Sequence, residues 1–320
     1  MSSPSNNTPL HFFEVTDEQA GQRIDNFLLR YLKGVPKSRI YRILRKGEVR
    51  VNKKRVKPTH RLESGSQIRI PPIRSAAEKP APTADSVAWI EKAILYEDEW
   101  LLVLNKPSGI AVHGGSGIRY GLIEGLRALR SEAENYELVH RLDRATSGLL
   151  LVAKRRSALR SLHELIRNHE IEKRYLALVA GKMRKSKTVL APLQKSVLRS
   201  GERVVRVDPE GKSAESHFRP QLACNNSTLV EVEIVTGRTH QIRVHGAHIN
   251  HPLAGDERYG DSDYNLRLKK MGLDRLFLHA HRLTLAHPKD GSTLRLEAPL
   301  PDQLNAVLEK LRQNEPCRSF

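Results

Sequence analysis

The sequence predicts an α+β protein with a small basic module at its N-terminus and a larger domain built on a mixed sheet. Two observations lead to this prediction. Positive charge is concentrated between residues 23 and 74, where it is interleaved with a periodic apolar pattern. After residue 89, strand patterns dominate the middle of the chain and helix patterns flank them, rather than alternating as in a βαβ series.

These patterns divide the chain into five segments. A polar N-terminal tail at 1–22 precedes the basic module at 23–74. The segment 75–88 is rich in proline and small residues and has no periodicity, so it is predicted to be a linker. The large domain spans 89–313, and 314–320 form a C-terminal tail.

Composition indicates the kind of partner and compartment. The chain has 320 residues and a formal net charge of +18, which favours a polyanionic partner. No apolar run is long enough to cross a membrane, and the first residues, MSSPSNNTPL, lack the features of a secretory signal. We expect a cytoplasmic protein without a membrane partner. The two cysteines, Cys224 and Cys317, are expected to form neither a disulfide framework nor a metal knuckle, which fits a reducing compartment.

The basic module carries 16 Lys and Arg against three acidic residues, a net charge of +13. Apolar residues at helical spacing predict helices near 24–31 and 40–46, and alternation after Gly47 predicts short strands with a turn at 52–54. A charge run that is merely solvated would lack this apolar stripe. Phosphate binding is the expected use of the basic face, whose members are Arg39, Arg42, Arg45, Lys46, Lys53 and Lys54.

The large domain reads as a series of strands with helices at its flanks. A Gly-rich loop at 113–117 leads into the first of these helices. A hairpin near the C-terminus is predicted to turn through Asp290-Gly291. Strands are predicted at 94–96, 100–104, 149–153, 172–181, 230–234, 276–285 and 293–297, and helices at 122–130, 158–166 and 304–311.

The stretch HRLDRATSG, residues 140–148, holds a single carboxylate, Asp143, between Arg141 and Arg144. Turn-forming residues and an apolar strand follow, so Asp143 is predicted to lie in a loop at the edge of a sheet. Guanidinium groups nearby would stabilise its charged form, which suits a nucleophile. A structural ion pair at a turn is the alternative interpretation.

Two more polar positions fall at element ends. Tyr175 lies in the strand predicted at 172–181, and Arg243 lies in TGRTHQIRVH, 236–245, where Thr239 is a candidate cap of a helix. Because sites are usually built on loops and strand ends that a rigid sheet positions, we expect these residues to be functional.

Five motifs together make the sequence recognisable: NKPSGIAVH (105–113), HRLDRATSG (140–148), EKRYLALV (172–179), GRTHQIRVH (237–245) and HPLAGDERYG (251–260). In this order they resemble the RluA-type family of pseudouridine synthases. Residues 23–74 resemble the RNA-binding module of a small-subunit ribosomal protein, the S4 type. The resemblance covers nearly everything except the tail and linker, and implies a mainly antiparallel central sheet flanked by helices. Finer features at 34–58, 111–117 and 121–130 point to family members that act on large-subunit (23S) ribosomal RNA.

The resemblance also implies residue roles. Asp143 matches the essential aspartate of the family, Tyr175 its active-site tyrosine, and Arg243 the basic residue that pairs with the aspartate. Arg141 matches the residue that fills the space left by the flipped uridine. Ala145 stands where family members often have Asp, so a mechanism with two carboxylates in this loop is excluded. The other substrate contacts expected in this domain are His140, Arg144, His113, Arg238 and His240.

The chemistry implied is the isomerisation of uridine to pseudouridine. The N1–C1′ bond breaks, the uracil turns while bound, the C5–C1′ bond forms, and the C5 proton leaves. No cofactor or metal is needed. Asp143 attacks C1′ or C6, or abstracts a ribose proton, and the sequence does not choose among these. Tyr175 would stack on the uracil or serve as base for the C5 proton. The expected partner is large-subunit rRNA, free or in assembly intermediates, and the chain is expected to act as a monomer.

Other interpretations were weighed. His245, His248 and His251 invite a zinc site, but there is no HExxH and Pro252 breaks the helical register. The glycines near residue 115 miss the spacing of a nucleotide-binding fingerprint. A ribosome assembly factor without catalysis would explain the basic module but not the larger domain. A synthase of the same family acting on different rRNA uridines would share every motif.

Overall fold

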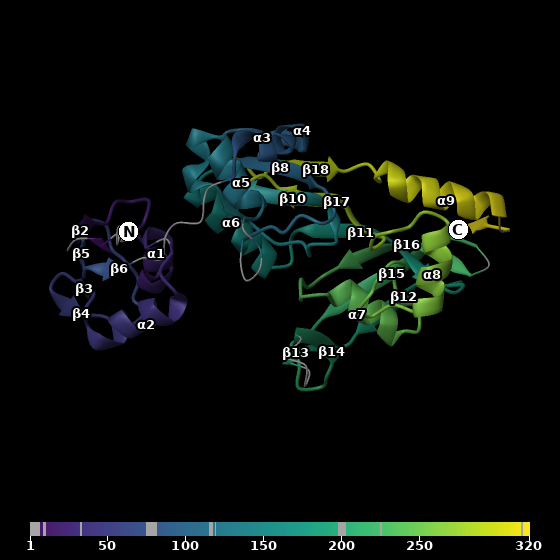
Figure 1. Ribbon diagram of the computed structural model, residues 1–320, viewed down its shortest axis with the longest axis horizontal. Coiled ribbons are helices and arrows are strands. Elements are labelled where there is room, and N and C mark those ends of the chain that lie inside the picture. Colours follow the sequence, from purple (N-terminus) through teal and green to yellow (C-terminus); the bar gives the residue numbers. More distant parts are fainter. Residues whose placement is uncertain are drawn as a thin grey trace, which may run out of the picture. The chain divides into compact units, whose positions relative to one another are not determined.

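The computed structural model describes residues 7–8, 11–32, 34–74, 82–114, 118, 120–197, 203–224, 226–314 and 316–320. The chain divides into two compact units, Met1–Ala81 and Pro82–Phe320 (Figure 1). Residues 75–81 of the predicted linker lie outside the described residues, as do residues 115–117 of the Gly-rich loop.

The N-terminal unit combines two helices with a small antiparallel sheet. The helices α1 (Ile24–Tyr31) and α2 (Lys37–Lys46) confirm those predicted from apolar spacing. Their buried apolar residues share one core with strand residues such as Val51 and Ile68. The sheet has the order β2-β5-β3-β4, with β2 (His11–Glu14), β5 (Gln67–Ile70), β3 (Arg50–Val51) and β4 (Lys54–Arg55), and β1 (Asn7–Thr8) pairs separately with β6 (Ile73–Arg74).

Two features of this unit bear on the predictions. The turn at 52–54 is confirmed, since Asn52 and Lys53 have φ values of 49° and 66°, the left-handed backbone of a tight hairpin. The predicted N-terminal tail, 1–22, is wrong for its second half. Strand β2 pairs with β5 and Val15 is buried, because Phe13 and Val15 supply apolar contacts that a polar average over the segment conceals.

The second unit is organised on an eleven-stranded sheet with the order β12-β15-β16-β11-β17-β10-β8-β7 and three further strands off this path. All its described pairs are antiparallel except β10 with β17, so the expectation of a mixed, mainly antiparallel sheet is confirmed. Its strands are β7 (Ile94–Glu97), β8 (Leu101–Lys106), β9 (Glu137–Leu138), β10 (Ser147–Ala153), β11 (Glu172–Ala180), β12 (Lys187–Leu190), β15 (Glu215–Ala223), β16 (Ser227–Ile234), β17 (Leu278–Ala286), β18 (Thr293–Glu297) and β19 (Arg318–Ser319).

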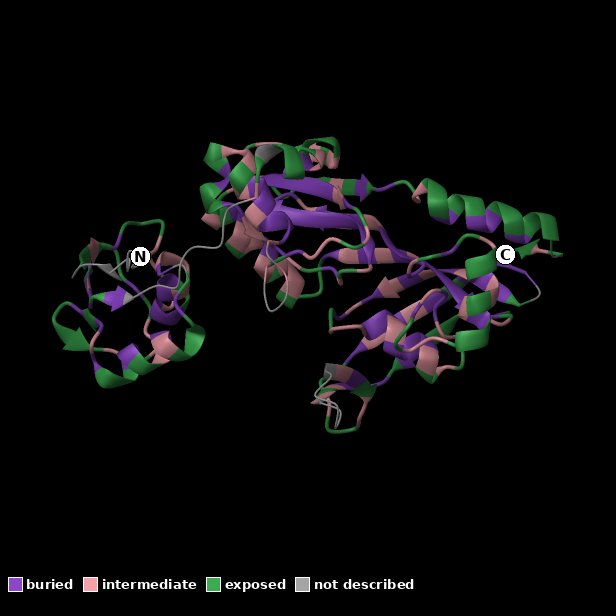
Figure 2. Ribbon diagram, viewed as in Figure 1, coloured by how far each residue is buried: buried purple, intermediate pink, exposed green. Residues whose placement is uncertain are grey.

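Helices cover both halves of this sheet. Helices α3 and α4 both contact α5, α6 packs on β10, and α7 packs on β15 and on β14, which forms a separate hairpin with β13. Figure 2 shows the central strands as the most buried part of this unit. The remaining elements are α3 (Ala84–Val87), α4 (Trp89–Lys92), α5 (Leu122–Leu129), the 3-10 helix η1 (Ser131–Asn135), α6 (Arg156–Arg167), α7 (Gln241–His248), α8 (Ser262–Lys270), α9 (Asp302–Asn314), β13 (Leu193–Val197) and β14 (Arg203–Val207).

Strand β10 positions the loop that precedes it. Its seven residues, SGLLLVA, are all buried, as expected for a strand covered on both faces. Its parallel pairing with β17 involves only Ser147 and Gly148. Gly148 has a φ of 109°, and a Cβ there would lie 2.2 Å from the carbonyl oxygen of Ala280. The loop 140–146 is therefore held close to β17 by a contact that only glycine permits.

The structure corrects the other two segment ends. The predicted linker extended to residue 88, but α3 covers 84–87 and Val87 is buried in the core. The predicted C-terminal tail contains β19, which pairs with β15, and Cys317 forms a disulfide with Cys224. The expectation of unpaired cysteines is therefore wrong. The two residues meet because β19 runs along the sheet edge, which their separation of 93 residues conceals. The hairpin turn at Asp290-Gly291 is confirmed. Among the described residues, no helix is long and apolar enough to cross a membrane.

Candidate active site

Asp143 lies in the loop between β9 and β10. The backbone N–H of Thr146 donates to the Asp143 carbonyl at 3.1 Å, which closes a turn. The carboxylate side chain keeps 20% of its surface exposed, so it is half-buried but open to a ligand. The placement predicted for Asp143, in a loop at the edge of a sheet, is confirmed.

The groups that face Asp143, one arginine and one histidine, come from the start of helix α7 rather than from its own loop. Arg243 Nη1 lies 3.6 Å from Asp143 Oδ2, and His240 Nε2 lies 3.8 Å from the same oxygen. Helix α7 begins at Gln241, and its N-cap is His240, with a φ of 55°. The predicted cap at Thr239 is wrong by one residue, because the left-handed backbone at His240 turns the chain into the helix.

Arg243 is anchored by a second carboxylate, Asp256. Its Nε and Nη2 donate to the two oxygens of Asp256 at 2.7 and 2.8 Å. Burial opposes the charge of Asp256, but Arg243 holds the pKa of this carboxyl below its usual range. The same pair raises the pKa of Arg243 against its own burial. This two-pronged contact fixes the plane of the guanidinium beside Asp143.

His240 belongs to the same network through Tyr259. The hydroxyl of Tyr259 lies 2.8 Å from His240 Nδ1 and accepts from the backbone N–H of Val205 at 3.0 Å. The Arg243 guanidinium lies 5.0 Å from the centre of the Tyr259 ring. Burial lowers the pKa of His240, although the nearby Asp143 opposes this effect. The hairpin of β13 and β14 is thereby tied to the side of the site formed by α7.

Tyr175 enters from strand β11 and is 8% exposed. Burial raises the pKa of its hydroxyl, and the charge of Asp143 adds to the effect. The hydroxyl is therefore a neutral phenol near pH 7. The three residues implied by the family resemblance, Asp143, Tyr175 and Arg243, lie in one region of the second unit, although they come from a loop, a strand and a helix.

Lys106 supports the Asp143 loop, and the sequence analysis did not predict this role. It ends strand β8 and is fully buried. Its Nζ donates to the carbonyls of Pro107 and Ile110 at 2.9 Å and of Arg144 at 3.3 Å. Burial and the charge of Arg275 lower the pKa of Lys106 to about 7, against the opposing charge of Asp143. Lysines are rarely buried, so a lysine closing an apolar run was the available signal.

The flanking residues of the Asp143 loop point elsewhere. Arg144 donates through Nε to the Gly109 carbonyl at 2.8 Å, and Arg141 is exposed. In the described part of the chain, neither pairs with Asp143, contrary to the expectation that these two guanidinium groups surround its carboxylate. Neighbours in a tight turn project in different directions. His140 accepts the backbone N–H of Leu151 through Nε2 at 3.1 Å, and burial lowers its pKa to about 4.

The other expected contacts are spread over the surface. His113 is exposed and lies 3.9 Å from Glu124, and Arg238 donates to the Ser213 carbonyl at 3.0 Å. In the N-terminal unit, Arg39 is partly exposed, and the exposed members of the basic face are Arg42, Arg45, Lys46, Lys53 and Lys54.

Two of the three histidines considered as zinc ligands have other partners. His245 bonds to Ser216 Oγ at 3.0 Å and the Ala191 carbonyl at 2.9 Å, and His251 bonds to the Ala180 carbonyl at 2.8 Å. Within the ranges that the structure describes, no group of three or more His, Cys, Asp or Glu residues is arranged to hold a metal ion.

Comparison with known proteins relates both units to RNA modification. Residues 100–248 match the family model for RNA pseudouridylate synthase, and residues 22–68 match the S4 domain. The chain is 55% identical over 314 residues to the ribosomal large subunit pseudouridine synthase C of Yersinia pestis, covering 97% of this chain and 98% of that protein. It is 53% identical over 313 residues to the protein of the same name from Haemophilus influenzae, covering 97% of each. The solved structure of human RNA Pseudouridylate Synthase Domain Containing 4 is similar, with a TM-score of 0.60 and 28% identity over 72% of this chain and 96% of that one.

Proposed function

This chain belongs to the RNA pseudouridylate synthase family, and on that premise we propose that it isomerises uridines of large-subunit ribosomal RNA with Asp143 as the essential carboxylate. The substrate is the one named for relatives that are more than half identical over nearly the whole chain. The observation that carries the role of Asp143 is its position, 20% exposed and 3.6 Å from an arginine that a buried carboxylate holds in place.

Asp143 acts alone as the reacting carboxylate. Asp256, the nearest alternative, is occupied by Arg243 and by backbone N–H groups of Arg258 and Tyr259. It has no free oxygen to offer a substrate. Ala145 supplies no second acid in the loop. The single carboxylate attacks C1′ or C6 of the uridine, or removes a ribose proton, while Arg243 orients it.

Tyr175 holds the uracil ring. A phenol whose pKa is raised by burial and by the charge of Asp143 is a poor proton acceptor near pH 7. Its ring can still stack on the base while the uracil turns. Of the two roles expected for Tyr175, the raised pKa favours stacking over direct removal of the C5 proton, and our proposal routes this proton through water.

The remaining contacts bring the target out of folded RNA. Unstacking a base costs a few kcal/mol. Arg141 is exposed and lies two residues before Asp143, so its side chain can fill the space that the flipped base leaves in the RNA stack. The basic face of the N-terminal unit supplies affinity through phosphates. We further propose that the protein acts as a monomer, since all the groups named come from one chain. We also propose that it works in the cytoplasm, where its RNA is, and that the reaction uses no metal or cofactor.

The test is tritium release from RNA labelled at uracil C5. We expect the purified protein to release tritium from large-subunit rRNA and not from small-subunit rRNA prepared in the same way. Mapping pseudouridines in rRNA from a strain without the gene identifies the uridines. A folded protein that binds large-subunit rRNA but releases no tritium from it, free or in assembly intermediates, would overturn the proposal.

A further inference from the structure

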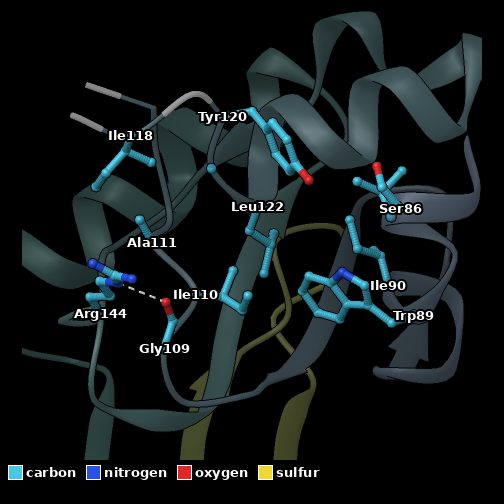
Figure 3. Close-up of a pocket in the computed structure, with 12 residues that line it drawn as sticks. Ser86, Trp89, Ile90, Gly109, Ile110, Ala111, Ile118, Tyr120, Leu122 and Arg144 are labelled. Atoms are coloured by element: carbon cyan, nitrogen blue, oxygen red, sulfur yellow. Dashed lines mark hydrogen bonds between the residues drawn. The ribbon is translucent and has the colours of Figure 1, made fainter. Parts of the chain in front are cut away.

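A pocket of about 270 Å³ lies beside the Asp143 loop. Its walls come from α3 and α4, from the segment 109–111, and from residues around the start of α5 (Figure 3). Arg144 is the only residue of the Asp143 loop that lines it, and none of Asp143, Tyr175 and Arg243 does so. The pocket is therefore a separate space that adjoins the site already described.

The walls suit a flat ring. Trp89 and Tyr120 are partly buried, packed on one side against the core, and both line the pocket. Ile110 and Leu122 add apolar surface between them and Arg144 (Figure 3). Every nucleobase has a π-face that stacks on aromatic side chains independently of sequence. These surfaces favour a planar, partly apolar ligand.

Arg144 gives the pocket a charged rim. Its Nε donates to the Gly109 carbonyl at 2.8 Å, which fixes the guanidinium at the pocket wall. Its terminal nitrogens have no partner in the part of the chain that the structure describes, and the residue is exposed. A guanidinium held in this way is suited to a phosphate or to the edge of a base. A neutral apolar metabolite would leave this charge unused.

The pocket is fixed rigidly to the reacting carboxylate. Lys106 binds the carbonyls of both Ile110 and Arg144. The Gly109 N–H donates to the Arg144 carbonyl at 2.8 Å, and Ser108 Oγ donates to the Ala145 carbonyl at 2.7 Å. The segment that lines the pocket and the loop that carries Asp143 are therefore one unit, with Arg144 directly after Asp143 in the chain.

We propose that this pocket binds a nucleobase of the substrate RNA that flanks the target uridine, stacked against Trp89 and Tyr120 with Arg144 on its phosphate or edge. The inference rests on the proposed function, because it takes the strand that delivers uridine to Asp143 as the source of the base. The fixed distance between this pocket and Asp143 would then select RNA in which a nucleotide beside the target uridine can leave its stack.

Tryptophan fluorescence tests the proposal directly, because the chain has two tryptophans. In the full-length Trp100→Phe variant, Trp89 is the sole reporter. We expect a large-subunit rRNA fragment that supports tritium release to quench it. Abasic substitution at one flanking nucleotide should abolish the quenching, while substitution at the others should not. The matched variant Trp89→Phe, which reports from Trp100, should lack this position-specific response.

A second pair of variants separates stacking from folding. Tyr120→Leu is expected to raise KM about fivefold or more, the factor that corresponds to ~1 kcal/mol of base stacking, and Tyr120→Phe should restore it. Unchanged Trp89 fluorescence in a complex that releases tritium normally, or quenching that survives every abasic substitution, would overturn the pocket's role and leave the proposed function standing. Absence of tritium release from the wild-type protein would instead overturn both.

Discussion

The guanidinium of Arg243 stands between two carboxylates whose surroundings differ. On one side lies Asp256, from the loop after α7. Its side chain has no exposed surface and accepts hydrogen bonds from Arg243 at 2.7 and 2.8 Å and from backbone N–H groups at 3.0 and 3.1 Å. On the other side lies Asp143, from the loop before β10, which is 20% exposed and lies 3.6 Å from Arg243. A carboxylate whose acceptors are all occupied fixes its partner, whereas one with free acceptors can meet a substrate. The same pair of residue types thus serves structure on one side and, in our proposal, chemistry on the other.

Removing Asp256 should have the largest effect on stability. Asp256→Ala leaves the largely buried Arg243 without its main partner, which is expected to lower the free energy of unfolding by about 3–5 kcal/mol. Asp143→Ala removes only a longer, partly exposed ion pair, with an expected cost below about 1 kcal/mol. Urea unfolding measures both. Equal costs for the two substitutions would remove the distinction between the two carboxylates.

Changing Arg243 should affect rate more than stability. Arg243→Lys keeps the charge but loses the two-pronged contact with Asp256, so the cation moves relative to Asp143. We expect kcat/KM for tritium release to fall about 100-fold, the scale of a 1 Å misplacement at a reacting centre. Arg184→Lys, at an exposed position outside the site, is the matched control. Wild-type kinetics in Arg243→Lys would show that the anchoring by Asp256 is irrelevant to the reaction.

Lys106 holds the Asp143 loop through the Arg144 carbonyl, and its contribution to the free energy of unfolding should depend on pH. Because the pKa of Lys106 is lowered to about 7 from 10.5, the folded protein binds fewer protons than the unfolded chain between these pH values. Unfolding then takes up protons, and the contribution of Lys106 to the free energy of unfolding increases as pH rises through this window. We expect the stability difference between wild type and Lys106→Met to shift in favour of wild type from pH 7 to pH 9. A constant difference would contradict the lowered pKa.

The smallest effect on the site is expected from the N-terminal unit. Substituting Arg42, Arg45 and Lys46 by Ala should weaken RNA binding and reduce the salt dependence of binding by about 0.7 per lost phosphate contact. Single-turnover rates at saturating protein should stay at the wild-type value. The control replaces exposed Arg184, Lys185 and Lys187 with Ala, which changes the charge equally. An equal loss of slope in both variants would mean that the basic face is not specific to the N-terminal unit.

Local sequence patterns were enough to predict where Asp143 lies in the fold, but not which groups surround it. The turn residues before an apolar strand placed Asp143 in a loop at the edge of a sheet, and apolar spacing placed the helices of the basic module. The charges around Asp143 were not predictable in this way. Arg141 and Arg144 are its neighbours in sequence, but the groups that face it, Arg243 and His240, are about 100 residues away. Family resemblance linked Arg243 to Asp143, and nothing in the sequence linked His240 to it.

The supporting residues were invisible for a related reason. Asp256 lies in a motif that was recognised, HPLAGDERYG, but its contact with Arg243 depends on how the segment after α7 folds back. Lys106 follows the strand predicted at 100–104, and its burial depends on three carbonyls from two separate segments. The C-terminal strand β19 is too short to show periodicity, so its pairing and the disulfide of Cys317 follow only from the completed sheet.

The most direct measurement of the central claim is single-turnover tritium release by Asp143→Asn, which removes the charge and nucleophilicity but keeps the shape of the side chain. The account predicts no release above background, with RNA binding and unfolding free energy close to those of the wild-type protein. Release at the wild-type rate would contradict it, because the reaction would then proceed without the one carboxylate that the site leaves open to a substrate.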